Sequence, residues 1–331
     1  MRAVVFAMFA LSAWAQTKTQ PNTGVISGVV TDHVGAIVKD APIQAINVVT
    51  GISIRGFSTA KGDYSLARVP AGKYVVSVIM PGFSFLPFVQ PNVEVQAGQA
   101  LKLNISLPEG PSLGTLGDDP ARSRTKTPAP AGPAPRTAYG KPDFSGVWQG
   151  NDDPFPEQPE LLPAVAARAK HMLETEGKDH PGARCLPGAA VVNGPFLYRM
   201  MQSRDVLLTI FEDVPGYRQV YLDGRGHPKD PNPTFLGHST GKWEGDTLVI
   251  DTVGFNEGWI GFNPSTDKLH LTERYRRRDL GRLDIKIEVT DPGAYARPWT
   301  INAIWELDPK AELLEYVCGE NNVDPAHMVG K

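Results

Sequence analysis

The sequence predicts an all-β protein built from two folded units, and three observations lead to this prediction. Between residues 24 and 107, runs of β-branched and aromatic residues end at glycine or proline, as expected of an antiparallel β-sandwich. Beyond residue 141, a second series of such runs predicts an antiparallel β-barrel or a curved sheet. Only residues 160–176 carry apolar side chains at convincing helical spacing, which predicts one helix with Gly177 at its C-cap.

The first residues predict export. Residues 1–15 combine Arg2, an apolar run and a terminal Ala-Trp-Ala triplet, which is the pattern of a secretory signal peptide cleaved before Gln16. No later stretch approaches the ~20 apolar residues that span a bilayer, so we expect no membrane span in the mature chain. The protein should therefore reach the periplasm or the medium.

Charge and cysteine content indicate which partners and which cross-links the protein is expected to have. The net charge is −3, and the one dense basic run, 274–278, is surrounded by acidic residues, so it predicts a solvated strand face and no nucleic-acid binding. Cys185 and Cys318 are the two cysteines, and in an oxidising compartment one disulfide is the economical interpretation, with two buried thiols as the alternative. The chain-entropy model gives such a long loop roughly 4–5 kcal/mol of stabilisation.

The first unit, 24–107, contains no cluster of residues suited to catalysis. Its last segment, 101–107, alternates apolar and polar residues, whereas 74–80 is apolar on both faces, as in a central strand. Segments 24–32, 60–65, 69–74 and 81–83 resemble the carboxypeptidase regulatory-like domain, a transthyretin-like β-sandwich. The resemblance implies a carbohydrate-binding-like fold. Sugar contact would need exposed aromatics, and Tyr74 is expected in the core instead.

A linker rich in proline and alanine, 108–140, is expected to act as an extended spacer before the second unit, 141–331. Residues 144–148 resemble the Gly-x-Trp opening of lipocalin-like barrels. Eight strands are predicted after it: 205–212, 217–223, 236–243, 247–253, 269–278, 283–290, 299–307 and 313–318.

The hairpin 269–290 allows its register to be predicted. The apolar residues of 283–289 share one face, and they face those of 269–275 only if the loop has an odd number of residues. A three-residue turn, 279–281, with Gly281 in the left-handed conformation satisfies this condition. Tyr275 then pairs with Ile285 and Glu273 with Ile287, while Arg276 lies opposite Asp284 on the solvated face. Glu273 therefore points inward.

An inward carboxylate has two interpretations. Glu273 could act as a general acid or base in a barrel cavity, together with His227 or His238, or it could form a structural pair with an inward basic residue such as Arg277. His227, Asp230 and His238 lack the spacing of a metal site, and no nucleotide, cofactor or nucleophile motif occurs. We therefore predict no metal and no cofactor.

An aromatic loop, 254–264, supplies candidate ligand-binding residues. Phe255, Trp259 and Phe262 could cover a barrel mouth or form a separate apolar cluster. Asp251, in a strong predicted strand, and the inward Tyr275 are added as further candidates.

Residues 217–322 resemble a large group of exported bacterial proteins, and this resemblance implies export without transferring any site residue. The leading hypothesis is a two-domain binding protein for a small, partly apolar ligand or a carbohydrate. The alternatives are a cofactor-independent hydrolase or isomerase that uses Glu273, and a structural envelope protein.

Overall fold

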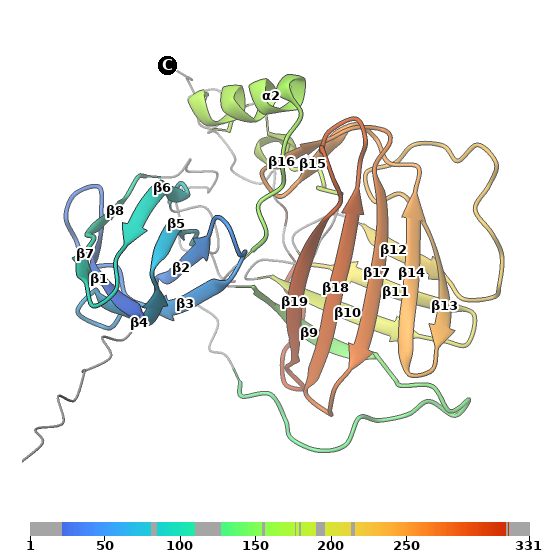
Figure 1. Ribbon diagram of the computed structural model, residues 1–331. Coiled ribbons are helices and arrows are strands. Elements are labelled where there is room, and N and C mark those ends of the chain that lie inside the picture. Colours follow the sequence, from blue (N-terminus) through green and yellow to red (C-terminus); the bar gives the residue numbers. More distant parts are fainter. Residues whose placement is uncertain are drawn as a thin grey trace, which may run out of the picture. The chain divides into compact units, whose positions relative to one another are not determined.

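The structure is a computed structural model that describes residues 22–80, 85–109, 127–153, 156–175, 177–178, 180–189, 196–212, 216–315 and 317 (Figure 1). The predicted signal peptide, much of the linker, the 81–83 motif and Cys318 lie outside these residues. The chain divides into two compact units. The first comprises Met1–Ser77 with Val89–Ser106, and the second Val78–Phe88 with Leu107–Lys331.

The first unit is a sandwich of two four-stranded sheets, which confirms the predicted fold of this part. One sheet has the order β4-β1-β7, with β8 also paired to β1, and the other has the order β3-β2-β5-β6. The pairing of β1 with β7 is parallel. The strands are β1 (Thr23–Asp32), β2 (Pro42–Asn47), β3 (Ser53–Phe57), β4 (Asp63–Pro70), β5 (Gly72–Val78), β6 (Phe88–Val95), β7 (Ala100–Lys102) and β8 (Ile105–Leu107).

Two tyrosines belong to the sandwich core. Tyr74 is fully buried and its hydroxyl donates to the carbonyl oxygen of Pro70, while Tyr64 donates to that of Leu103. Burial raises the pKa of Tyr64 to about 12. Because each hydroxyl has a backbone acceptor, each ring can be buried without leaving its polar group unpaired. The core position predicted for Tyr74 is confirmed.

The second unit contains a closed barrel in the order β10-β11-β12-β13-β14-β17-β18-β19-β9, as Figure 1 shows. All neighbouring pairs are antiparallel except β12 and β13, which are parallel because the long segment 222–237 returns the chain before β13 begins. The strands are β9 (Gly146–Asp152), β10 (Leu197–Gln202), β11 (Val206–Phe211), β12 (Tyr217–Tyr221), β13 (His238–Glu244), β14 (Thr247–Val253), β17 (His270–Arg277), β18 (Arg282–Thr290) and β19 (Trp299–Leu307).

The strand predicted at 313–318 is wrong over its described residues, which form no strand. Strand β9, which contains the Gly-x-Trp segment, takes the place beside β19 and closes the barrel against β10. No barrel edge therefore remains for a later strand to extend. The backbone N–H of Leu314 donates instead to a carboxylate oxygen of Glu212 at 2.7 Å.

Aromatic side chains fill much of the barrel. Trp148 and Trp305 are almost fully buried, and Tyr198 stacks on Trp305 with 4.5 Å between ring centroids. The indole N–H of Trp148 donates to the carbonyl oxygen of Phe144, and the guanidinium of Arg277 lies over the Trp148 ring. Large side chains with satisfied polar atoms therefore occupy the interior.

The hairpin of β17 and β18 has the predicted register. Tyr275 pairs with Ile285, Glu273 with Ile287 and Arg276 with Asp284. Gly281, however, does not have the predicted left-handed conformation, because its φ is not in the positive range. A Cβ added to Gly281 would lie 2.3 Å from the carbonyl oxygen of Pro130. This position excludes a side chain because another backbone segment lies against it, not because the turn is left-handed.

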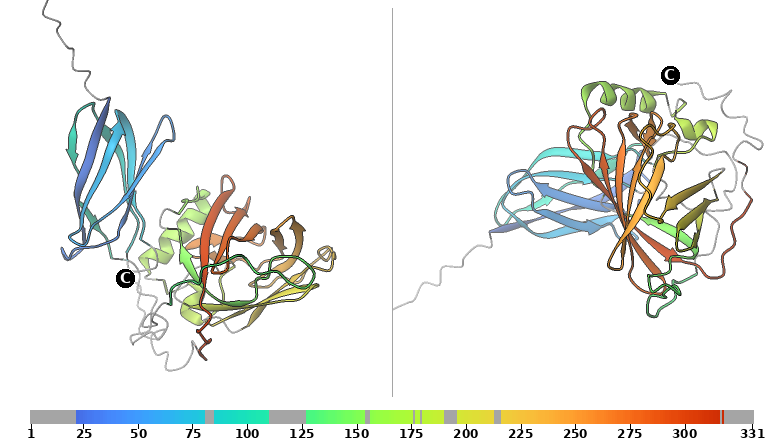
Figure 2. Two further views of the ribbon diagram at one scale, coloured as in Figure 1. Left: turned by 90° about the horizontal axis from the view of Figure 1, so that it is seen from below. Right: turned by 90° about the vertical axis from the view of Figure 1, so that its right-hand side faces the viewer.

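That neighbouring segment, 127–145, belongs partly to the predicted linker and lies against the barrel (Figure 2). The guanidinium of Arg136 donates to both carboxylate oxygens of Asp246, at 3.0 and 2.5 Å. Tyr139 donates to the carbonyl oxygen of Ser203, and Arg277 donates to the carbonyl oxygen of Asp143. Local composition predicts a spacer, but these contacts join its last part to the second unit.

Helix α2 (Pro163–Glu174) is shorter than the predicted 160–176. Leu161 forms a β-bridge with Tyr295, so the chain stays extended until Pro163, a residue suited to the first helical turn. Val165 and Met172 are the buried residues of α2, and the backbone N–H of Gly177 bonds to the carbonyl oxygen of Met172. Val165 and Met172 thus mark the face of α2 that packs against the rest of the second unit.

Candidate functional site

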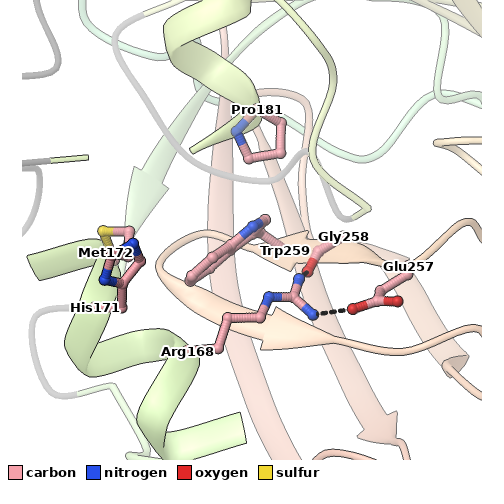
Figure 3. A pocket seen from close by; sticks show the side chains of 7 residues that line it. All are labelled: Arg168, His171, Met172, Pro181, Glu257, Gly258 and Trp259. Atoms are coloured by element: carbon pink, nitrogen blue, oxygen red, sulfur yellow. Dashed lines mark hydrogen bonds and ion pairs between the residues drawn. The ribbon is translucent and has the colours of Figure 1, made fainter. Parts of the chain in front are cut away.

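The candidate site is a pocket of about 430 Å³ between α2, the short 3-10 helix η1 (Pro181–Arg184) and the hairpin of β15 (Gly258–Ile260) and β16 (Asn263–Ser265). Figure 3 shows Arg168 reaching from α2 toward Glu257 and Gly258, with Trp259 beside it. The lining residues are Arg168, His171, Met172, Pro181, Glu257, Gly258 and Trp259.

Arg168 connects α2 to the hairpin. Its guanidinium donates to Glu257 at 2.5 Å and to the carbonyl oxygen of Gly258 at 2.5 Å, and it contacts that of Ser265 at 3.4 Å. It also lies over the Trp259 ring, 4.9 Å from the ring centroid (Figure 3). These contacts fix a positive charge at the wall of the pocket, where a cation–π contact adds to hydrogen bonding.

His180 also contacts Trp259. Its ring lies 5.5 Å from that of Trp259 and 5.7 Å from that of Phe262. Nδ1 of His180 accepts from the backbone N–H of Gly182, so the neutral ring carries its proton on Nε2 and donates it to the carbonyl oxygen of Gly261. Burial lowers the pKa of His180, which favours this neutral form.

The aromatic loop therefore divides between two places. Trp259 lines the pocket, and Phe262, half-buried, contacts His180 beside it. Phe255 instead belongs to the barrel core, where it is 1% exposed, and Tyr275 lies in the same core. Of the five residues predicted to bind a ligand, Trp259 is thus the one on the wall of this pocket.

Glu273 lies inside the barrel and is bound by Arg218. The Arg218 guanidinium donates to both carboxylate oxygens of Glu273, and the hydroxyl of Tyr275 donates to one of them at 3.1 Å. Arg218 also donates to Ser239 and Thr252. Burial opposes the charge of Arg218, but Glu273 raises the pKa of Arg218 above its ordinary value. The predicted inward position of Glu273 agrees with the structure, but its basic partner is Arg218 rather than Arg277.

The predicted histidines lie on the outer face of the barrel. Asp251 accepts from His270 at 2.5 Å and contacts His227 at 3.2 Å, while Nδ1 of His227 lies 2.8 Å from Nδ1 of His238. Burial and the neighbouring His227 lower the pKa of His238. Asp251 has a side-chain exposure of 41% and lies on the outer face. Its neighbour Thr252, one residue on, occupies the inner face.

The structure therefore does not bring the three candidate catalytic residues together. In the described part of the chain, no group of three or more His, Cys, Asp or Glu side chains has the geometry to hold a metal ion. Cys185 follows η1, and because Cys318 is not described, the disulfide remains a prediction. No described helix is long and apolar enough to cross a membrane.

Two residues that make these contacts, Arg218 and Arg168, were not predicted from the sequence. Arg218 could have been found, because Val220 points inward and a residue two positions away in a strand shares its face. Arg168 had a weaker signal. It stands three residues after Val165 and four before Met172, beside the buried face of the helix, but only tertiary contacts bring it to Trp259.

Comparisons with known proteins were made for the whole chain. Residues 25–108 match the carboxypeptidase regulatory-like domain. No curated protein matches the chain. Among solved structures, BcpA, the major pilin subunit of Bacillus cereus, is 21% identical at a TM-score of 0.23 over 27% of this chain and 31% of its own, so the match spans about a third of that pilin.

Two further solved structures are described as candidate carbohydrate-binding proteins. PA1324 from Pseudomonas aeruginosa is 14% identical at a TM-score of 0.20, over 27% of this chain and 92% of its own. A protein from Bacteroides uniformis ATCC 8492 is 9% identical at a TM-score of 0.22, over 87% of this chain and 100% of its own. Because residues 25–108 match its family model, the N-terminal sandwich is a carboxypeptidase regulatory-like domain.

Proposed function

We propose that this is an exported binding protein whose second unit takes up a small, partly apolar ligand in the pocket beside α2. The supporting observation is the pocket's composition. Met172, Pro181 and Trp259 lie on the apolar side of a cavity of about 430 Å³, where Met172 is 1% and Trp259 5% exposed, and Arg168 and Glu257 provide charged groups at the same cavity. Sites for small ligands combine these features at volumes of about 300–1,000 Å³. In this proposal the N-terminal sandwich is an accessory module.

A carbohydrate fits this pocket less well. A sugar ring stacks on an open aromatic face. Trp259 is 5% exposed, with Arg168 over its ring. In the sandwich Tyr64 and Tyr74 are buried, whereas Phe57 is 50% exposed. A ligand with an apolar part that enters beside Trp259, rather than a sugar that stacks on it, is therefore the better candidate.

The hydrolase or isomerase alternative would need Glu273 to exchange protons beside a histidine. Glu273 lies on the inner face with two Arg218 donors, whereas His227 lies on the outer face with Asp251. Arg218 and Tyr275 occupy the carboxylate oxygens of Glu273, so a substrate would have to compete with them. The structural envelope alternative predicts that no small ligand binds.

Titration calorimetry with 2-naphthoate and 2-naphthamide, a matched acid and amide, tests the proposal. Gly258→Leu should remove binding, because a Cβ at Gly258 meets only ordinary contacts at 3.7 Å or more and the added side chain would fill the pocket. The matched control is Gly226→Leu, at a glycine with open space around it. Failure of both compounds to bind the wild-type protein, or equal binding by the two variants, would contradict the proposal.

A further inference from the structure

We infer that the pocket selects a small organic carboxylate, and that Glu257 occupies the anion's position on Arg168 when no ligand is bound. This inference rests on the proposed function and adds the chemical class of the ligand. It follows from a difference between Arg168 and Glu257: several contacts fix Arg168, whereas Glu257 is mostly exposed.

Arg168 is fixed from several sides. Besides Glu257, its guanidinium contacts the carbonyl oxygens of Gly258 and Ser265 and lies over the Trp259 ring. Its side chain is 30% exposed. A ligand cannot displace this guanidinium without breaking its backbone contacts as well, and those contacts already orient its planar group.

Glu257 is held much more weakly. Its side chain is 67% exposed, and among the described residues it forms an ion pair with Arg168. Exposed ion pairs contribute only about 0–1 kcal/mol, since both charges are well solvated when apart. Glu257 can therefore leave Arg168 at little cost, while Arg168 stays in place.

The exchange determines the class of ligand. A ligand carboxylate can replace that of Glu257 on the guanidinium, whose geometry matches a carboxylate. The ligand's apolar part would then lie against Pro181 and the small exposed part of Trp259, with the buried Met172 behind them. A ligand amine would have to compete with the fixed Arg168 for the mobile Glu257, which is the less favourable exchange. The charges at the pocket therefore favour an anion with an apolar body.

The acid and the amide separate this inference from the proposed function. With wild-type protein, 2-naphthoate should bind about tenfold or more tightly than 2-naphthamide, because a charge-assisted hydrogen bond is worth about 1.5–3 kcal/mol. Glu257→Gln should tighten 2-naphthoate binding about two- to fivefold by removing the competing carboxylate, and should leave 2-naphthamide unchanged.

Arg168→Met should reduce the affinity for the acid to that for the amide, and circular dichroism checks that this variant folds. Glu257→Gln, at an exposed side chain, keeps the test valid if Arg168→Met does not fold. Equal affinities of acid and amide for the wild-type protein, unaffected by Glu257→Gln, would overturn the inference and leave the proposed function standing. Absence of binding by either compound would overturn the proposed function itself.

Discussion

Inside the barrel, Arg218 of β12 donates hydrogen bonds to both carboxylate oxygens of Glu273 on β17. Two intervening strands provide the hydroxyls of Ser239 and Thr252, which accept two further N–H groups of Arg218. Glu273 is 1% exposed and the Arg218 side chain 14%. Such a pair stabilises the fold only while both partners are present, because either charge alone would be buried without compensation.

Removal of one partner should therefore be costly. We expect Arg218→Met to lower the free energy of unfolding by about 3–5 kcal/mol, and Arg218→Met with Glu273→Gln to recover part of that loss. Urea unfolding followed by tryptophan fluorescence is the measurement, and it reports on the barrel unit because residues 22–109 contain no tryptophan. A loss below about 1 kcal/mol for the single variant would show that the pair is not a structural element.

Gly281 tests the contact between the 127–145 segment and the barrel. A Cβ at this position would approach the carbonyl oxygen of Pro130 to 2.3 Å, so Gly281→Ala should destabilise the barrel by about 1–3 kcal/mol. Gly226→Ala, in open space, is the control and should change stability by no more than about 0.5 kcal/mol. The same unfolding assay applies, and equal effects of the two substitutions would be incompatible with the described contact.

His238 gives the fold a pH dependence whose sign can be stated. Its folded-state pKa is lowered from 6.5, mainly by burial and then by His227, so the unfolded chain binds a proton more readily than the folded chain. The contribution of His238 to the free energy of unfolding is therefore present above about pH 6.5. It is lost as the pH falls through the lower pKa of the folded state. NMR titration of its ring protons should give a midpoint below 6.5. A midpoint at or above 6.5 would refute this assignment.

The disulfide predicted between Cys185 and Cys318 has a direct chemical test. Peptide mapping without reductant should recover the two cysteines in one linked fragment, and reduction should lower stability by roughly 4–5 kcal/mol. Recovery of two alkylated thiols from the native, unreduced protein would favour the alternative of free cysteines.

Predictions from sequence succeeded where the determining interactions are local. The alternation in 269–290 was sufficient to place Glu273 inward and to fix its pairing with Ile287. The reason for Gly281 could not be predicted, because Pro130 is far away in sequence. The order of strands was also inaccessible, since the parallel pairing of β12 with β13 depends on the path of a long connection. The aromatic loop predicted Trp259 as a candidate. Its neighbours Arg168 and Pro181 could not be predicted, because they come from other elements that only the tertiary fold brings to it.

The most direct test of the proposed binding site uses the indole N–H signals of the tryptophans in an NMR titration with 2-naphthoate. Trp259 lines the pocket, whereas Trp148 and Trp305 are buried in the barrel core. Binding should shift the Trp259 signal together with the backbone signals of Arg168 and Gly258, and should leave Trp148 and Trp305 unchanged. Shifts centred on Trp148, Trp305 and Glu273, or no shift at all, would contradict the proposed site.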